Sequence, residues 1–145
     1  FGWNNSFSYK KFDLSFFLRG VAGNTILNGT LAALNDVNYA ASNNIPKFSL
    51  SEPIGDINSF YYSDRFLENG SYVRLDNATL GYTIDLSKIK LKSARLYITG
   101  NNLFVITNYR GVDPEINMGG IEPSIDNNNF YPKTRSYILG ISLNF

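Results

Sequence analysis

Apolar and small polar residues alternate along the first part of the chain. From Phe1 to Tyr9 the odd positions are mostly aromatic and the even positions are small and polar. A period of two places these two sets on opposite faces of a β-strand. The alternation restarts after Lys10-Lys11 and runs from Phe12 to Gly23, so we predict a second strand joined to the first by a two-residue hairpin turn.

Three further strands are predicted from the same alternation. One runs from Ser71 to Ile84 and slips by one residue near Asp76-Asn77, which is typical of a β-bulge. The next runs from Ala94 to Thr107, with a second slip expected at Asn101-Asn102. The last, from Ser136 to Phe145, has the cleanest alternation of the chain.

The connections between these strands alternate in length. Lys10-Lys11 and Asp85 to Ser93 are short, whereas Asn24 to Gly70 and Asn108 to Arg135 are long and polar. The first long connection has apolar residues at helical spacing, which predicts a short helix there, at Leu31, Leu34, Val37 and Ala41. Transmembrane β-barrels have short periplasmic turns and long extracellular loops, with apolar residues facing lipid. The pattern therefore predicts an all-β fold of antiparallel strands from such a barrel.

The number of predicted strands sets a limit on this interpretation. The smallest outer-membrane barrels have about eight strands, and an open sheet edge in lipid would leave backbone groups without hydrogen-bond partners. We therefore expect residues 1–145 to be the carboxy-terminal strands, about five, of a larger barrel. Two alternatives stay open: a soluble β-rich ligand-binding module, or a small self-contained outer-membrane barrel with further strands within Asn24 to Gly70.

Composition narrows the possible functions. The chain has no His and no Cys, which excludes Ser-His-Asp triads, thiol nucleophiles and disulfides. Its formal net charge of +1 gives no field suited to nucleic acid. No acid pair suited to glycoside hydrolysis is visible on the predicted strands. We therefore expect neither an enzyme nor a cofactor.

Three segments together carry a resemblance to a known family. They are SDRFLENGSYVRLDNATLGYTI from Ser63, ARLYITGNNLFVITNYRGVDPEIN from Ala94, and YPKTRSYILGISLNF at the end of the chain. They are similar to the carboxy-terminal region of the SusC/RagA family of TonB-dependent outer-membrane transporters. The opening FGWNNSFSYKKFDLSFFLRG extends this resemblance over essentially the whole chain.

The resemblance implies a barrel of about 22 strands with a plug domain, in the outer membrane of a Gram-negative bacterium. A SusD-like surface lipoprotein would act with it to import glycan or peptide fragments. The plug, the TonB box and about seventeen strands are not in this sequence. TonB would therefore act on it only through an amino-terminal part that this chain lacks.

The last predicted strand resembles the signal that the barrel-assembly machinery reads. Such a machine can recruit a strand by edge pairing, using backbone hydrogen bonds and pockets for alternate side chains. The candidate signal residues are Tyr137, Leu139, Ile141, Leu143 and Phe145. An alternative is that Tyr137 and Phe145 are aromatic anchors at the two membrane interfaces.

Aromatic residues in the long connections are candidate contacts for a ligand or for the lipoprotein lid, since a ring with a polar tip suits a wet interface. They are Phe60, Tyr61, Tyr62, Phe66, Tyr109, Phe130 and Tyr131. The alternative is that they pack the loops together.

Acidic residues in the second long connection raise the question of Ca²⁺, which takes carboxylate and carbonyl oxygens as ligands. They are Asp113, Glu115, Glu122 and Asp126. Their spacing matches no EF-hand loop, and a turn at Pro114 explains the GVDPEIN segment equally well, so we expect no metal ion. The lysines of the short connections suit lipid headgroups or simple solvation.

Overall fold

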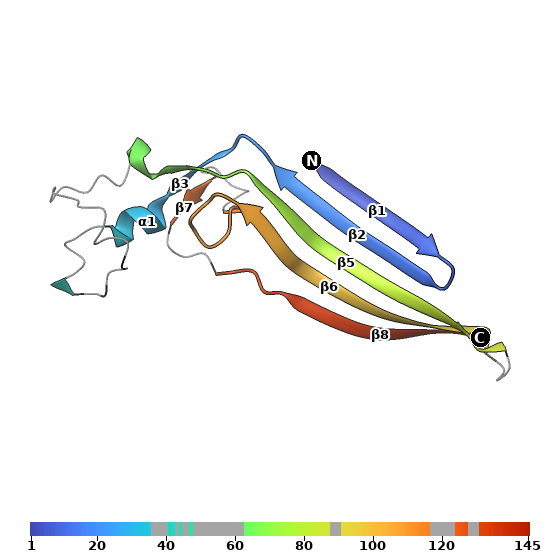
Figure 1. The fold of residues 1–145 in the computed structure, drawn as a ribbon. Coiled ribbons are helices and arrows are strands. Elements are labelled where there is room, and N and C mark those ends of the chain that lie inside the picture. Colours follow the sequence, from blue (N-terminus) through green and yellow to red (C-terminus); the bar gives the residue numbers. More distant parts are fainter. Residues whose placement is uncertain are drawn as a thin grey trace. The chain divides into compact units, whose positions relative to one another are not determined.

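Figure 1 shows the computed structural model of the chain, which describes residues 1–35, 41–42, 44, 47, 63–87, 91–116, 124–127 and 131–145. The chain divides into two compact units. The strand unit contains Phe1–Val21, Tyr72–Ile106 and Lys133–Phe145, and the loop unit contains Ala22–Ser71 and Thr107–Pro132. Each unit therefore combines segments that are far apart in the sequence.

The strand unit is built on a five-stranded sheet with the order β1-β2-β5-β6-β8. The pairs β1–β2, β2–β5 and β6–β8 are antiparallel. The five strands lie within one or two residues of the predicted ranges, which confirms the prediction. They are β1 (Gly2–Tyr9), β2 (Phe12–Val21), β5 (Tyr72–Asp85), β6 (Ser93–Thr107) and β8 (Ser136–Asn144).

The predicted phase slip in β5 is a β-bulge. Phe17 pairs with Asn77 and Leu18 with Leu75, so Asp76 is the extra residue. The bulge brings the Asp76 carboxylate to Arg19, whose Nε and Nη2 donate to it over 2.6 and 3.1 Å. At the second predicted slip, Asn102 has a φ of 52°, a left-handed conformation that Asn tolerates better than most residues.

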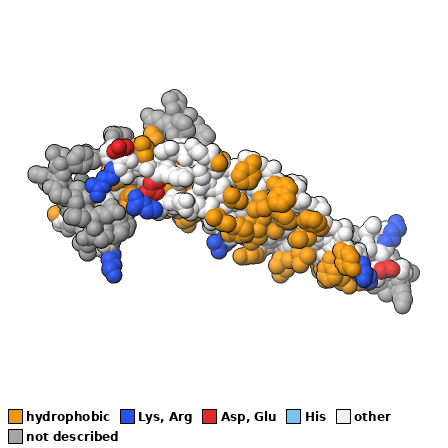
Figure 2. Space-filling view, turned by 45° about the horizontal axis from the view of Figure 1, so that its top comes forward, with side chains coloured by type: hydrophobic (Ala, Val, Ile, Leu, Met, Phe, Trp, Pro, Cys, Tyr) orange, Lys and Arg blue, Asp and Glu red, His pale blue; other side chains and the backbone are white. Residues whose placement is uncertain are grey.

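One face of the sheet is apolar and largely exposed. Directly paired residues of antiparallel strands share a face, and the pairs on this face include Phe7 with Leu14 and Ile98 with Leu139. Leu139 is 80% exposed. Figure 2 shows hydrophobic side chains gathered along this part of the molecule. The period of two has therefore produced a broad apolar surface without a covering layer in the described residues.

The opposite face is polar, and glycines make room for its side chains. The Arg95 guanidinium of β6 reaches across β5 to the Asp13 carboxylate of β2, with Arg95 Nε 2.8 Å from Asp13 Oδ1. A Cβ at Gly81, on the strand between them, would collide with both side chains. A Cβ at Gly140 would likewise collide with the ring of Tyr97. At both positions a glycine is needed, because any side chain would occupy the space that the cross-strand contact uses.

Strand β8 places its alternate residues on the predicted faces. Leu96 pairs with Ile141 and Tyr97 with Gly140, so Ile141 lies on the apolar face and Gly140 on the polar one. The predicted separation of Leu139, Ile141 and Leu143 from Gly140, Ser142 and Asn144 is thus confirmed as a feature of the sheet.

The loop unit contains a small sheet that the sequence analysis did not predict. Its strands are β3 (Thr25–Asn28), β4 (Leu67–Asn69) and β7 (Ile125–Asp126), in the order β4-β3-β7. Strand β3 is antiparallel to β4 and parallel to β7. Because these strands are two to four residues long, they show no alternation that could have been read from the sequence.

The predicted helix is present and short. Helix α1 (Gly29–Leu34) includes Leu31 and Leu34, Ala41 lies outside it, and Val37 lies outside the described residues. The Asn28 side chain accepts a hydrogen bond from Leu31 N over 2.8 Å, which explains where the helix begins. A 3₁₀ helix, η3 (Asp64–Phe66), precedes β4.

Among the described residues of the loop unit, buried hydrophobic side chains form two small clusters, one of Leu31, Ala32 and Phe66 and the other of Ile26, Tyr109 and Ile116. None of the helices in the described part of the chain is long and apolar enough to cross a membrane.

Candidate functional site

A buried carboxylate joins three segments of the loop unit. Asp126 of β7 is 2% exposed. It accepts hydrogen bonds from the hydroxyl of Thr30 in α1, over 2.6 Å, and from the phenol of Tyr109, over 2.7 Å. Hydrogen bonds to a buried charged acceptor are among the stronger ones in proteins. Asp126 therefore ties the end of one long connection to the start of the other.

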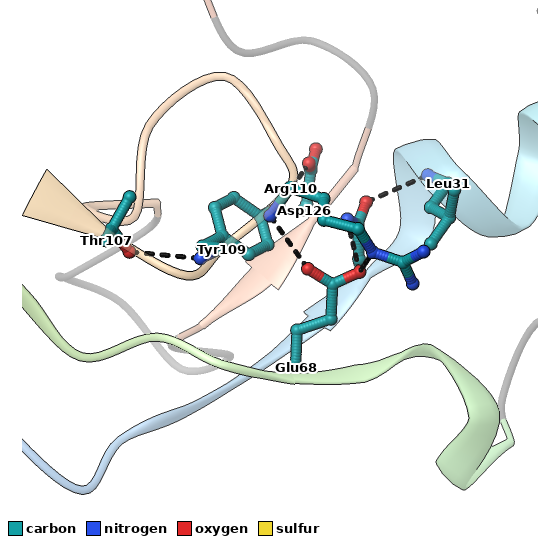
Figure 3. Close-up of polar contacts among 7 residues, drawn as sticks. Leu31, Glu68, Thr107, Tyr109, Arg110 and Asp126 are labelled. Atoms are coloured by element: carbon teal, nitrogen blue, oxygen red, sulfur yellow. Dashed lines mark hydrogen bonds and ion pairs between the residues drawn. The ribbon is translucent and has the colours of Figure 1, made fainter. Parts of the chain in front are cut away.

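A second carboxylate makes a parallel set of contacts (Figure 3). Glu68 of β4 accepts hydrogen bonds from the backbone N–H of Arg110 over 2.9 Å, from Arg110 Nε over 2.8 Å, and from Asn28 Nδ2 over 3.1 Å. Its side chain is nearly buried, whereas that of Arg110 is half exposed. We call Glu68, Asp126 and their partners Asn28, Thr30, Tyr109 and Arg110 the loop clamp.

Thr107 orders the chain leading into the clamp. Its Oγ1 accepts from the Tyr109 N–H over 3.1 Å and donates to the Ser71 carbonyl over 2.9 Å. These contacts fix Tyr109 two residues after the end of β6, from where its phenol reaches Asp126 (Figure 3).

The environment of Tyr109 keeps its phenol protonated. Burial raises the pKa of Tyr109 well above its usual value, and the hydrogen bond to Asp126 and the charges of Asp126 and Glu68 add to this effect. A raised folded-state pKa gives stability that is present below the unfolded pKa of about 10 and is lost as the pH rises beyond it. The clamp therefore keeps its tyrosine donor throughout the neutral range.

The structure separates the candidate contact residues into different environments. Phe66 and Tyr109 are 4% and 5% exposed and belong to the core clusters. These two positions agree with the alternative interpretation, in which aromatic residues of the long connections pack the loops together, because both rings are shielded from solvent. Tyr131 is 82% exposed. The other candidates, Phe60, Tyr61, Tyr62 and Phe130, lie outside the described residues.

The acidic residues of the second connection have structural roles where they are described. Glu115 N donates to Asp113 Oδ1 over 2.9 Å, which closes a turn around Pro114. Asp126 is engaged by Thr30 and Tyr109. Glu122 lies outside the described residues. Within the described ranges there is no group of three or more His, Cys, Asp or Glu side chains that could hold a metal ion.

A pocket of about 270 Å³ opens beside the clamp, lined by Asn28, Thr30, Leu31, Leu34, Arg110 and Gly111. Sequence reasoning did not single out Arg110 or Glu68, which are 42 residues apart in the chain. One residue of the clamp could have been found from the local sequence. Asn28 is a residue type that favours helix starts, and it comes shortly before the apolar residues at helical spacing.

The candidate assembly residues are all exposed, four of them on β8 and Phe145 directly after it. They are Tyr137, Leu139, Ile141, Leu143 and Phe145. In the sheet order β8 is an edge strand, paired with β6 on one side only among the described strands. An edge strand presents a row of backbone groups that can pair with a further strand.

Comparison with known proteins gives consistent relatives. The chain is 32% identical to TonB-dependent receptor P3 of Formosa agariphila, over 99% of this chain and 16% of that protein. It is 34% identical to TonB-dependent receptor SusC of Bacteroides thetaiotaomicron, over 99% of this chain and 15% of that protein. No protein-family model matches the chain.

Comparison of structures agrees with the comparison of sequences. A chain of the RagAB peptide importer in its open-open state matches with a TM-score of 0.71 at 24% identity, over 99% of this chain and 17% of that chain. The chain thus spans about one sixth of the length of the curated relatives and solved structures that it matches.

Proposed function

Because this chain is a segment of the SusC/RagA family of TonB-dependent receptors, we propose that it forms the carboxy-terminal strands of a nutrient importer in the outer membrane of a Gram-negative bacterium. The observation that carries the proposal is the five-stranded sheet with one exposed apolar face. In water such a face would be a large apolar patch, whereas in a barrel wall it meets lipid.

The two faces of the strand unit have different roles in this proposal. The apolar face, which includes Leu139 and Ile141, contacts lipid. The face with Asp13, Arg95 and Tyr97 lines the lumen, where polar side chains and ion pairs are tolerated. The long connections lie outside the cell, and the loop clamp holds parts of both in one ordered unit.

The partners follow from the relatives and from the share of the barrel that this chain supplies. Strands β1 and β8 pair with the remaining strands of the transporter, which encloses a plug. A SusD-like surface lipoprotein contacts the extracellular side, and the barrel-assembly machinery inserts the protein. TonB acts through the amino-terminal part.

The cargo in this proposal is a glycan or peptide fragment, and the RagAB peptide importer is the structural neighbour whose name gives such a cargo. The segment supports transport rather than catalysis.

The two alternatives are less well supported. A soluble module would leave the apolar face of the strand unit in water. A small self-contained barrel would need further spanning strands of about 9 to 11 residues. The described strands of the loop unit have only two to four residues, which is too short for that role.

Lipid contact on β8 is expected to alternate from one residue to the next. Spin labels or fluorophores placed singly at Ile141 and Ser142 of the intact transporter should respond differently to a lipid-soluble quencher, with strong quenching at position 141 and weak quenching at position 142. The reason is the period of two, since neighbouring residues of a strand face opposite sides. Equal quenching at both positions would contradict the barrel assignment.

The direction of the strands predicts which connections are reachable from outside the cell. Epitope tags inserted at Asn43 and at Asn128 should be stained on intact cells, whereas a tag at Lys11 should be stained only after the outer membrane is opened. A carboxy-terminal strand that ends in the periplasm fixes this alternation. Staining of the Lys11 tag on intact cells would mean that the topology is reversed.

A further inference from the structure

The strand unit has an apolar groove next to a cationic turn, and we propose that together they bind one anionic phospholipid. An acyl chain lies in the groove and the headgroup phosphate meets Lys10. This inference rests on the proposed membrane location and adds a specific lipid site to it. Its parts lie entirely within the strand unit.

The groove is a hollow of about 620 Å³ across β2, β5, β6 and β8. Its side-chain walls include Phe12, Leu80, Tyr82, Leu96, Leu139 and Ile141. These residues come from the apolar face, so the groove offers hydrocarbon contact and few polar groups. An acyl chain is the class of ligand that fits such a surface, because a chain seated in the groove makes close van der Waals contacts on several sides.

One end of the groove lies against the turn between β1 and β2. Phe12 follows the turn directly, and its ring contacts that of Tyr82 with centroids 4.7 Å apart. The Thr83 N–H donates to the Lys11 carbonyl over 2.8 Å, which fixes the turn beside the same part of β5. Figure 2 shows basic side chains at an end of the apolar face.

Lys10 has an unusual conformation for its residue type. Its φ is 55°, in the left-handed region where hairpin turns ordinarily use Gly or Asn. The ammonium group lies over the ring of Tyr9, 5.3 Å from its centroid. A strained residue in a turn is a reason to look for a function. Here the result is a cation fixed next to exposed aromatic rings, the arrangement that suits the headgroup level of a bilayer.

The two lysines of the turn differ in their surroundings. Lys11 is close enough to the Asp85 carboxylate to interact with it electrostatically, whereas Lys10 is held by the aromatic ring of Tyr9. A phosphate therefore gains more at Lys10. Free inorganic phosphate would use only this cation, and a lipid without net charge would gain little from it. An anionic phospholipid uses both the cation and the groove, so it should bind better than inorganic phosphate or an uncharged lipid.

The test uses the intact transporter that contains this chain, reconstituted in nanodiscs of phosphatidylethanolamine with a minor share of phosphatidylglycerol. Native mass spectrometry then counts the phosphatidylglycerol retained by the released protein. The variant Lys10→Asn should lower retention about fivefold, the effect of one basic residue near a lipid surface. This variant folds readily because Asn accepts the left-handed turn. Lys10→Arg keeps the charge and should retain the lipid.

Two further variants separate the parts of the site. Leu96→Trp fills the groove and should lower retention even though the turn is unchanged. Lys92→Gln, in the other short connection, is the matched control and should retain phosphatidylglycerol as the wild type does. Retention lost to millimolar inorganic phosphate, or equal retention by all variants, would overturn the lipid site. A protein that does not enter nanodiscs at all would instead contradict the proposed membrane function.

Discussion

Deleting Phe145, or replacing it with serine, is expected to reduce the amount of transporter in the outer membrane several-fold while each assembled molecule imports at nearly the wild-type rate. Phe145 is an exposed aromatic residue directly after the edge strand β8. Its burial at a barrel rim contributes about 1.5 to 3 kcal/mol, which is small beside the many backbone hydrogen bonds of a barrel. Failed recruitment instead leaves an apolar chain exposed to aggregation and proteases.

The measurement compares surface abundance and heat-modifiability on gels for Phe145→Ser and for Phe145→Trp. The tryptophan variant is the control, because it keeps a large aromatic ring at the end of the strand and should assemble normally. If Phe145 acts only as an interfacial anchor, the serine variant should assemble in normal amounts with slightly lower stability. Wild-type abundance of the serine variant would therefore refute the assembly-signal hypothesis.

Replacing Asp126 with alanine is expected to open the loop clamp. The change removes the acceptor of two hydrogen bonds and leaves the hydroxyls of Thr30 and Tyr109 without this partner in a buried region. Each hydrogen bond to a charged group contributes about 1.5 to 3 kcal/mol, so the loop unit should lose about 3 to 6 kcal/mol. Hydrogen exchange of the intact transporter should show faster exchange in α1 and around Tyr109.

Two comparisons make this experiment specific. Tyr109→Phe removes one of the two hydrogen bonds and keeps the ring in the core, so its effect should be about half as large. The strands β1 and β2 belong to the other unit, and their exchange should stay at the wild-type rate. If Asp126→Ala leaves exchange around α1 unchanged, the clamp does not hold the loop unit together.

The role of the loop aromatics could not be decided from the sequence. Phe66 and Tyr109 carry the same composition signal as Tyr131, yet the first two are buried and the third is exposed. The difference arises from contacts over long sequence distances, since Phe66 packs in a cluster with Leu31 and Tyr109 in a cluster with Ile26. Local patterns carry no information about such pairings.

The strands and their faces, by contrast, were determined by the sequence itself. Alternation with a period of two is a local property, so it predicted all five strands of the main sheet and the slip that places Asp76 in a bulge. It also predicted which residues of β8 share a face.

Only the tertiary structure showed why particular glycines are needed and how the long connections are joined. Gly81 matters because Asp13 and Arg95 meet across it, and this contact exists only once three strands are in register. The small sheet of the loop unit likewise forms from segments too short to show a period. Alternation sets the faces of a strand through neighbouring residues, whereas register and loop packing depend on which distant segments meet.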